Sequence, residues 1–141
     1  MILFDTNVVS AIMRAEQEPV VINWLRQQQL PLLYIGTPTL FEVQFGIASL
    51  PKGRRRTTLE ERFRAVLQET FADRILDFSI SEALTAGEIH CAHISAGRNV
   101  DVPDSMIAGI ARHVGATIAT RNTKDIAGTG LQLINPWAVS S

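Results

Sequence analysis

The sequence contains little cysteine and little lysine, and neither sign of charge is in excess. Cys91 is the only cysteine among 141 residues, which excludes a disulfide within the chain and is typical of a protein in a reducing cytosol. Lys52 and Lys124 are the only lysines, and the formal net charge is −1, so the chain as a whole does not attract nucleic acids. Only a local basic patch remains compatible with nucleic-acid binding.

Long apolar runs are also absent. The N-terminal run "MILF" is followed at once by Asp5 and has no basic segment before it. We therefore expect no signal peptide, no membrane-spanning helix and a cytoplasmic location. Internal repeats, low-complexity tracts and linkers are not evident either, so we expect one domain over residues 1–141.

Short apolar runs alternate with amphipathic segments along the whole chain. Runs typical of strands lie at 1–4, 32–36, 74–79, 116–120 and 131–136. Helices are expected at 6–14, 19–29, 37–50, 81–98 and 102–115, and a long helix is expected after the basic turn at 51–56. The helix at 81–98 is expected to bury a stripe formed by Leu84, Gly87, Cys91 and Ile94. The alternation predicts an α/β fold with three layers, in which helices cover both faces of a central parallel sheet.

Acidic and amide side chains follow the predicted strands or begin the predicted helices. They are Asp5, Glu42, Asp104, Asn122 and Asp125. Because the carboxyl ends of parallel strands meet at one edge of a sheet, we expect these side chains to share that edge. Carboxylates that meet in a partly buried notch repel one another unless they bind protons or a divalent cation. Oxygen ligands without histidine or cysteine suit Mg²⁺ or Mn²⁺. The alternative is that each acid simply caps a helix.

Several segments together resemble a PIN domain, and among PIN domains the VapC-type toxins of bacterial toxin–antitoxin pairs. These segments are "MILFDTNVVS", "TLFEVQFGI", "DVPDSMIAGIARHVGATIATRN" and "LQLINPW". The strand end "ATR" and the terminal "NPW" are similar to the FitB-like branch. The resemblance covers nearly the whole chain and implies a PIN-like fold with metal-dependent cleavage of RNA.

The resemblance also implies roles for individual residues. Asp5, Glu42 and Asp104 match the acidic metal positions of the family, and Asn122 stands where the family often has aspartate. Asp125 can supply the missing charge. Thr6, Asn7 and Thr120 match positions that orient the acids by hydrogen bonds. The implied partners are an RNA substrate, a cognate antitoxin, a second copy in a homodimer, and promoter DNA reached only through the antitoxin, with no membrane contact.

The basic segment "KGRRR" is a candidate contact for RNA phosphates or a protein partner. It contains Lys52, Arg54, Arg55 and Arg56. A solvated loop between helices explains the same charges without any ligand.

Two further functions remain open at this point. A strand that ends in Asp5 is also found in phosphohydrolases that use the aspartate as a nucleophile, although such sites usually have a second aspartate where this chain has Asn7. Alternatively, Asn122 has removed catalysis, and the chain is a PIN module that binds RNA or antitoxin without turnover.

Overall fold

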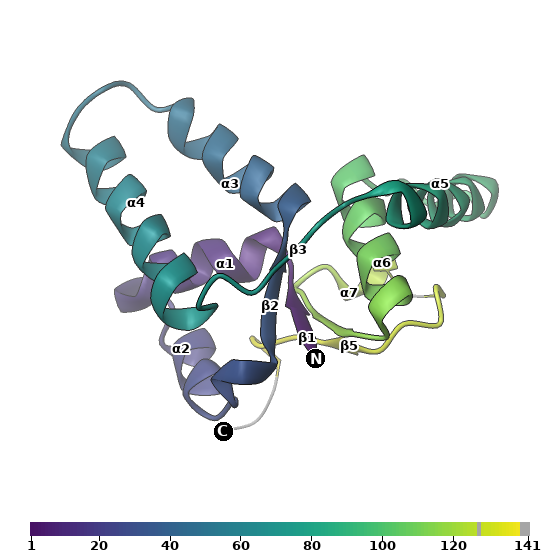
Figure 1. Ribbon diagram of the computed structural model, residues 1–141, viewed down its shortest axis with the longest axis horizontal. Helices are drawn as coiled ribbons and strands as arrows, with labels where there is room; N and C mark the ends of the chain where they lie inside the picture. The colour runs from purple at the N-terminus through teal and green to yellow at the C-terminus, as the bar shows by residue number, and fades with distance from the viewer. Residues whose placement is uncertain (127, 139–141) are drawn as a thin grey trace.

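The computed structural model describes residues 1–126 and 128–138, apart from the side chain of Asp125 (Figure 1). The strands in these residues are β1 (Ile2–Phe4), β2 (Leu33–Gly36), β3 (Ile75–Leu76), β4 (Thr117–Ala119) and β5 (Leu133–Ile134). The α-helices are α1 (Thr6–Met13), α2 (Pro19–Arg26), α3 (Thr37–Ala48), α4 (Arg54–Ala65), α5 (Ile80–Ser95), α6 (Val102–Val114) and α7 (Thr123–Ile126). Shorter turns are η1 (Ala15–Gln17), η2 (Leu30–Leu32) and η3 (Val66–Thr70), of which η3 is a π-helix. No helix in the described part of the chain is both long enough and apolar enough to cross a membrane.

The strands form one parallel sheet in the order β3-β2-β1-β4-β5, as the alternation in the sequence predicts. In the central strand, Leu3 pairs with Tyr34 of β2 on one side and with Ile118 of β4 on the other. The strand order therefore reverses at β1, and an open parallel sheet has a crevice beyond the carboxyl end of its strands at such a reversal. Asp5, which follows β1, lies at this place.

Helices cover both faces of the sheet, which confirms the predicted layers (Figure 1). Phe4 faces the core that α1, α2, α3 and α4 close, where its ring meets Phe71 edge-on at 5.2 Å between centroids. Leu3 faces the opposite core, which α5 and α6 close with Ile89, Ile107 and other apolar residues. This alternation of neighbouring side chains is the period-two pattern of a strand that is buried on both faces.

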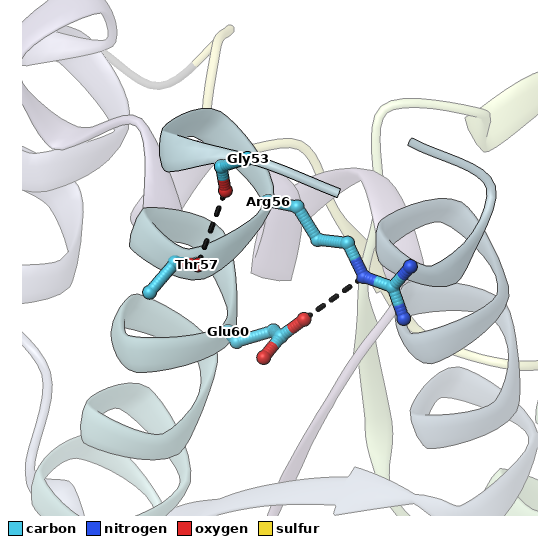
Figure 2. A network of polar contacts seen from close by, with 4 residues as sticks. All are labelled: Gly53, Arg56, Thr57 and Glu60. Carbon is cyan, nitrogen blue, oxygen red and sulfur yellow. Dashed lines mark hydrogen bonds and ion pairs between the residues drawn. The ribbon is translucent and has the colours of Figure 1, made fainter. Parts of the chain in front are cut away.

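The helix after the basic turn begins earlier than the sequence indicates. Arg54, Arg55 and Arg56 form the first turn of α4, whereas we expected them in a loop at 51–56. Figure 2 shows two contacts that support this start: the Thr57 hydroxyl donates to the Gly53 carbonyl at 3.1 Å, and Arg56 pairs with Glu60 at 3.0 Å. Side chains four residues apart in a helix can meet in this way, so the basic segment belongs to the helix.

The stripe predicted to be buried on α5 faces outward instead. Leu84 is 69% exposed, Ile94 is 55% exposed, and Cys91 is also exposed. The prediction that Cys91 packs in the core was therefore wrong. The residues that α5 buries are Glu82, Ala86, Ile89 and His93. The reason is steric, because α5 approaches α6 closely through small residues, with Ala86 opposite Gly109.

Substitution of Gly109 tests this close approach. A Cβ atom at Gly109 would lie 2.7 Å from the Ala86 Cβ and 2.8 Å from the Glu82 carbonyl oxygen. We expect Gly109→Ala to lower the free energy of unfolding by about 1–3 kcal/mol, measured by urea denaturation, because α5 has to move away. Gly46→Ala is the control, since a Cβ there meets nothing within 4 Å and the helix gains up to about 1 kcal/mol. Equal effects of the two substitutions would contradict the tight contact.

Candidate functional site

Asp5 is a buried carboxylate whose two oxygens both accept hydrogen bonds. It is 2% exposed and caps α1, with Oδ1 accepting from the Thr6 backbone N–H at 2.8 Å. Oδ2 accepts from the Thr120 hydroxyl at 2.7 Å and from the Asn7 amide at 3.3 Å. These donors and the positive end of the α1 dipole stabilise a negative charge in a buried position. The three residues predicted to orient the acids all contact Asp5 or its neighbour Glu42.

Glu42 reaches the same place from α3. The Thr6 hydroxyl donates to its Oε1 at 2.6 Å, so Thr6 links both acids. Partial burial raises the pKa of the Glu42 carboxyl above its ordinary value, and the negative charges of Asp5 and Asp101 raise it further. The hydrogen bond from Thr6 acts in the opposite direction. Glu42 therefore stands in a region of accumulated negative charge.

The start of α6 supplies two more acids. Asp104 lies in the first turn and is 8% exposed, so its side chain is directed away from bulk solvent. Asp101 is the N-cap residue, is exposed, and lies close enough to Glu42 to shift its pKa. We did not single out Asp101 from the sequence. The signal was its position two residues before Pro103, because a proline in the first helical turn indicates that the cap lies one or two residues before it, and aspartate is a preferred cap.

The segment after β4 adds neutral polar groups at this edge. The Asn122 backbone N–H donates to the Thr120 hydroxyl oxygen at 3.0 Å, and the Arg121 backbone N–H donates to Asn7 Oδ1 at 3.2 Å. Asn122 is exposed, and its backbone contact with Thr120 places the residue next to the hydroxyl that donates to Asp5. The candidate Asp125 lies in α7, but its side chain is outside the described residues.

The acids do not form a closed cage for a metal ion. Among the described residues, no three histidine, cysteine, aspartate or glutamate side chains are close enough together to hold one ion. Asp5 and Glu42 nevertheless share Thr6 as a donor and offer only hard oxygen ligands. Mg²⁺ commonly binds one or two carboxylates and keeps several waters, so this donor set fits a hydrated Mg²⁺ or Mn²⁺ ion.

A basic groove lies beside Glu42, between α1, α3 and α4. Its cavity has a volume of about 780 Å³ and is lined by Thr6 and Glu42 together with four arginines, namely Arg14, Arg54, Arg55 and Arg62. Arg62 is engaged by Glu16 at 2.9 Å. Of the predicted basic segment, Arg54 and Arg55 line this basic groove, Arg56 is held by Glu60 (Figure 2), and Lys52 is exposed in the preceding turn.

The chain belongs to the PIN-domain family, whose model matches residues 2–128. It is 39% identical over 137 residues to plasmid stability protein StbB of Pseudomonas syringae pv. tomato, covering 97% of this chain and 99% of that protein. VapC ribonuclease Y4jK of Sinorhizobium fredii is 33% identical, covering 97% of this chain and 98% of that protein. Toxin FitB of Neisseria gonorrhoeae is 32% identical over 97% of this chain and 99% of that protein. The crystal structure of FitAcB from the same organism matches with a TM-score of 0.87 and covers 99% of this chain and 100% of that one.

The raised pKa of Glu42 makes a prediction about stability and pH. Because the folded state holds the Glu42 proton more tightly than the unfolded chain does, ionisation of Glu42 lowers stability as the pH rises from its ordinary value of 4.5 through the higher folded value. Glu42→Gln retains an oxygen for Thr6 and cannot ionise. We expect this variant to gain stability relative to the wild type between about pH 4 and pH 7, measured by denaturant unfolding at each pH.

Asp101→Asn serves as the companion variant, because it removes one of the negative charges that raise the pKa of Glu42. In this background the gain from Glu42→Gln should become smaller. The stability of Glu42→Gln is compared with that of the wild type at the two ends of this pH range. An equal difference at both ends would contradict the raised pKa of Glu42.

Proposed function

We propose that the protein is a metal-dependent endoribonuclease that acts as the toxin of a toxin–antitoxin pair. The observation that carries this proposal is the pairing of Asp5 and Glu42 through Thr6 at the carboxyl edge of the sheet, with Asp101 and Asp104 at the start of α6. Relatives named VapC ribonuclease and Toxin FitB support it, because their similarity extends over nearly the whole chain.

We propose that Asp5, Glu42 and Asp104 hold Mg²⁺ or Mn²⁺ together with its bound waters, since the three side chains do not converge closely enough for all of them to bind the ion directly. When bound, such an ion lowers the pKa of a coordinated water and neutralises charge on a phosphodiester. The protein's part is to hold Asp5 in one orientation through Thr120 and Asn7. Glu42 Oε1 accepts from Thr6, and its raised pKa suits the other oxygen, Oε2, to receive a proton from the attacking water.

The geometry of Asp5 argues against its use as a nucleophile in a phosphohydrolase. Such sites usually have a second aspartate two residues after the nucleophile, whereas here Asn7 occupies that position and donates its amide to Asp5 Oδ2 at 3.3 Å. An amide cannot exchange a proton with a leaving group as a carboxyl can. The Asp5 carboxylate also caps α1 and accepts from Thr120 at 2.7 Å, which suits a ligand or orienting role.

RNA is the substrate that the basic groove fits. Arg54 and Arg55 project from the first turn of α4 into a groove that also contains Glu42, so a phosphate chain bound there passes the acids. Arginine pairs with phosphate through two parallel hydrogen bonds. This local charge accounts for RNA binding by a chain whose net charge is only −1.

A cognate antitoxin is the protein partner that this assignment implies. The structure of FitAB has been solved bound to an IR36 DNA fragment. The chain of that structure which matches this protein is 31% identical to it, with a TM-score of 0.88. We infer that promoter DNA is bound by this chain only through its antitoxin, because the chain has no overall positive charge.

The first experiment is cleavage of total cellular RNA by the purified chain with Mg²⁺, with Mn²⁺ and with EDTA. We expect discrete fragments only with metal, and a rate reduced to about a hundredth or less in Asp5→Asn and Asp104→Asn. Titration of Mn²⁺ binding by electron paramagnetic resonance gives a readout that does not depend on turnover, and both variants should bind more weakly. Asp77→Asn, an exposed aspartate before α5, is the matched control.

Full activity in Asp5→Asn or Asp104→Asn would refute the ligand assignment. A folded, antitoxin-free wild type that binds RNA without cutting it would instead favour the binding module. In that case, Asn122→Asp is the substitution to examine first.

The basic groove makes a separate prediction about RNA affinity. In an Asp104→Asn background, the double variant Arg54→Ala/Arg55→Ala should bind single-stranded RNA more weakly and lower the salt slope by about 1.4, since each phosphate contact contributes about 0.7. Arg56→Ala is the matched control, because Arg56 is adjacent but is held by Glu60 outside this groove. Similar losses in the two variants would show that the groove does not hold the RNA.

A further inference from the structure

Arg121 lies over the ring of Trp137 at the carboxyl edge of the sheet. The distance from the Arg121 Cζ atom to the centroid of the indole is 4.3 Å, which makes this a cation–π contact. Arg121 follows the end of β4 and Trp137 follows the end of β5, and these two strands pair in parallel. The contact therefore joins the segments that leave two neighbouring strands. We call the two side chains the Arg–Trp pair.

The indole of Trp137 is fixed from two directions. The Trp137 backbone N–H donates to Asn135 Oδ1 at 3.0 Å, which closes a tight turn after β5. The indole Nε1–H donates to Glu18 Oε2 at 3.0 Å, and the ring packs against the core that contains Phe4. A ring that is held at its backbone, at its polar atom and along its apolar surface is a rigid support for a cation.

The backbone of Arg121 belongs to the proposed active site. Its N–H donates to Asn7 Oδ1 at 3.2 Å, and the Asn7 amide donates in turn to Asp5 Oδ2 at 3.3 Å. The preceding residue, Thr120, donates its hydroxyl to the same oxygen of Asp5 at 2.7 Å. The Arg121 side chain is therefore attached one residue away from a direct contact with the buried carboxylate.

The guanidinium of Arg121 is accessible to an anion. Arg121 is exposed, and no ion pair joins it to another of the side chains that the structure describes. A cation–π contact uses no acceptor atom, so the N–H groups of the guanidinium can still donate to an anion. Arg56 and Arg62 differ in this respect, because Glu60 and Glu16 engage them.

The strand order places this cation on the far side of Asp5 from the basic groove. β1 is the central strand, and β2 and β4 flank it. Glu42, in the wall of the basic groove, is carried by α3, which follows β2, whereas Arg121 follows β4. Asp5 follows β1 and lies between them. An RNA strand that leaves the basic groove and passes the acids would next meet Arg121.

We propose that Arg121 binds an RNA phosphate on the side of Asp5 opposite the basic groove, and that Trp137 is a positioning residue that holds the guanidinium there. This inference rests on the proposed function, because it names a further contact of the same RNA strand. A guanidinium binds phosphate through two parallel hydrogen bonds and has to be oriented to do so. The indole restricts Arg121 before RNA arrives, so less conformational entropy is lost on binding.

The alternative is that the Arg–Trp pair only fastens the end of the chain to the site. Loss of either side chain would then disturb Thr120 and Asn7, and with them the Asp5 carboxylate. The two explanations differ in metal binding, because a phosphate contact can be removed without any change at the acids. They also differ in charge, since only a phosphate contact depends on the positive charge of Arg121.

Binding of fluorescein-labelled single-stranded RNA in an Asp104→Asn background tests the proposal. We expect Arg121→Gln to weaken binding about fivefold and to lower the salt slope by about 0.7, the contribution of one phosphate contact. Trp137→Leu keeps the charge, so binding should weaken with a smaller change in the salt slope, and Trp137→Phe, which keeps a ring face, should restore most of the affinity. Arg26→Gln is the matched control, because Arg26 is exposed at the end of α2 and does not line the basic groove.

Mn²⁺ binding to the otherwise wild-type chain, measured by electron paramagnetic resonance, separates a phosphate contact from a structural fastening. Arg121→Gln retains the backbone N–H that donates to Asn7, so its Mn²⁺ affinity should stay within about twofold of the wild type. In RNA cleavage, the same variant should raise KM and leave kcat close to the wild type, because the lost contact is far from the reacting atoms. Weaker Mn²⁺ binding with an unchanged salt slope would show a structural role and overturn the proposal.

The remaining outcomes distinguish this inference from the proposed function. If the wild type cleaves RNA with metal, but Arg121→Gln binds RNA with the affinity and salt slope of its Asp104→Asn parent, only the inference is refuted. A wild type that neither binds nor cleaves RNA would overturn both. Loss of antitoxin binding in Arg121→Gln, with RNA affinity unchanged, would identify the antitoxin as the ligand of Arg121 and also refute the inference.

Discussion

The burial of the Asp5 carboxylate is the constraint on which the rest of the site depends. A charge in that position is stable only if donors surround it, and the donors come from separate parts of the chain. Thr6 and Asn7 belong to the first turn of α1, whereas Thr120 follows β4. The parallel pairing of Phe4 with Ala119 brings the ends of β1 and β4 together, and the Asp5 backbone N–H donates to the Ala119 carbonyl at 2.9 Å. The carboxylate therefore ties the centre of the sheet to the proposed active site.

Burial and, to a smaller extent, like charges act on the carboxylates at the rest of this edge. Glu42 lies near Asp5 and Asp101, and its pKa is raised by burial and by both negative charges. The hydrogen bond from the Thr6 hydroxyl lowers the pKa of Glu42 by more than either neighbouring charge raises it, but burial keeps the net shift upward. A fold that concentrates acids in this way gives up stability in the free state, and a bound cation would restore it. A carboxyl in a cleft whose pKa is raised by burial and by neighbouring charges is for this reason a physical indication of function rather than of packing.

Most of the architecture and the central acids could be predicted from the sequence because buried parallel strands leave a clear signal. The runs that include Leu3 and Ile118 are short and apolar, and each is followed by a polar residue of the site. The outward face of α5 could not be predicted in this way. Periodicity identifies an apolar stripe but not the surface that covers it, and the contact between Ala86 and Gly109 decides which side faces α6. Asp101 and the engagement of Arg56 by Glu60 depend on side-chain geometry that spacing alone does not encode.

Two cavities have Glu42 in their walls, and they differ in chemistry. On one side, Arg14 and three arginines of α4 line the basic groove together with Glu16. On the other side, Phe41, Phe78 and Val102 line an apolar hollow of about 510 Å³. The net charge of −1 conceals this local contrast. Because the same carboxylate stands in both walls, a group that enters either cavity changes the electrostatic environment of Glu42.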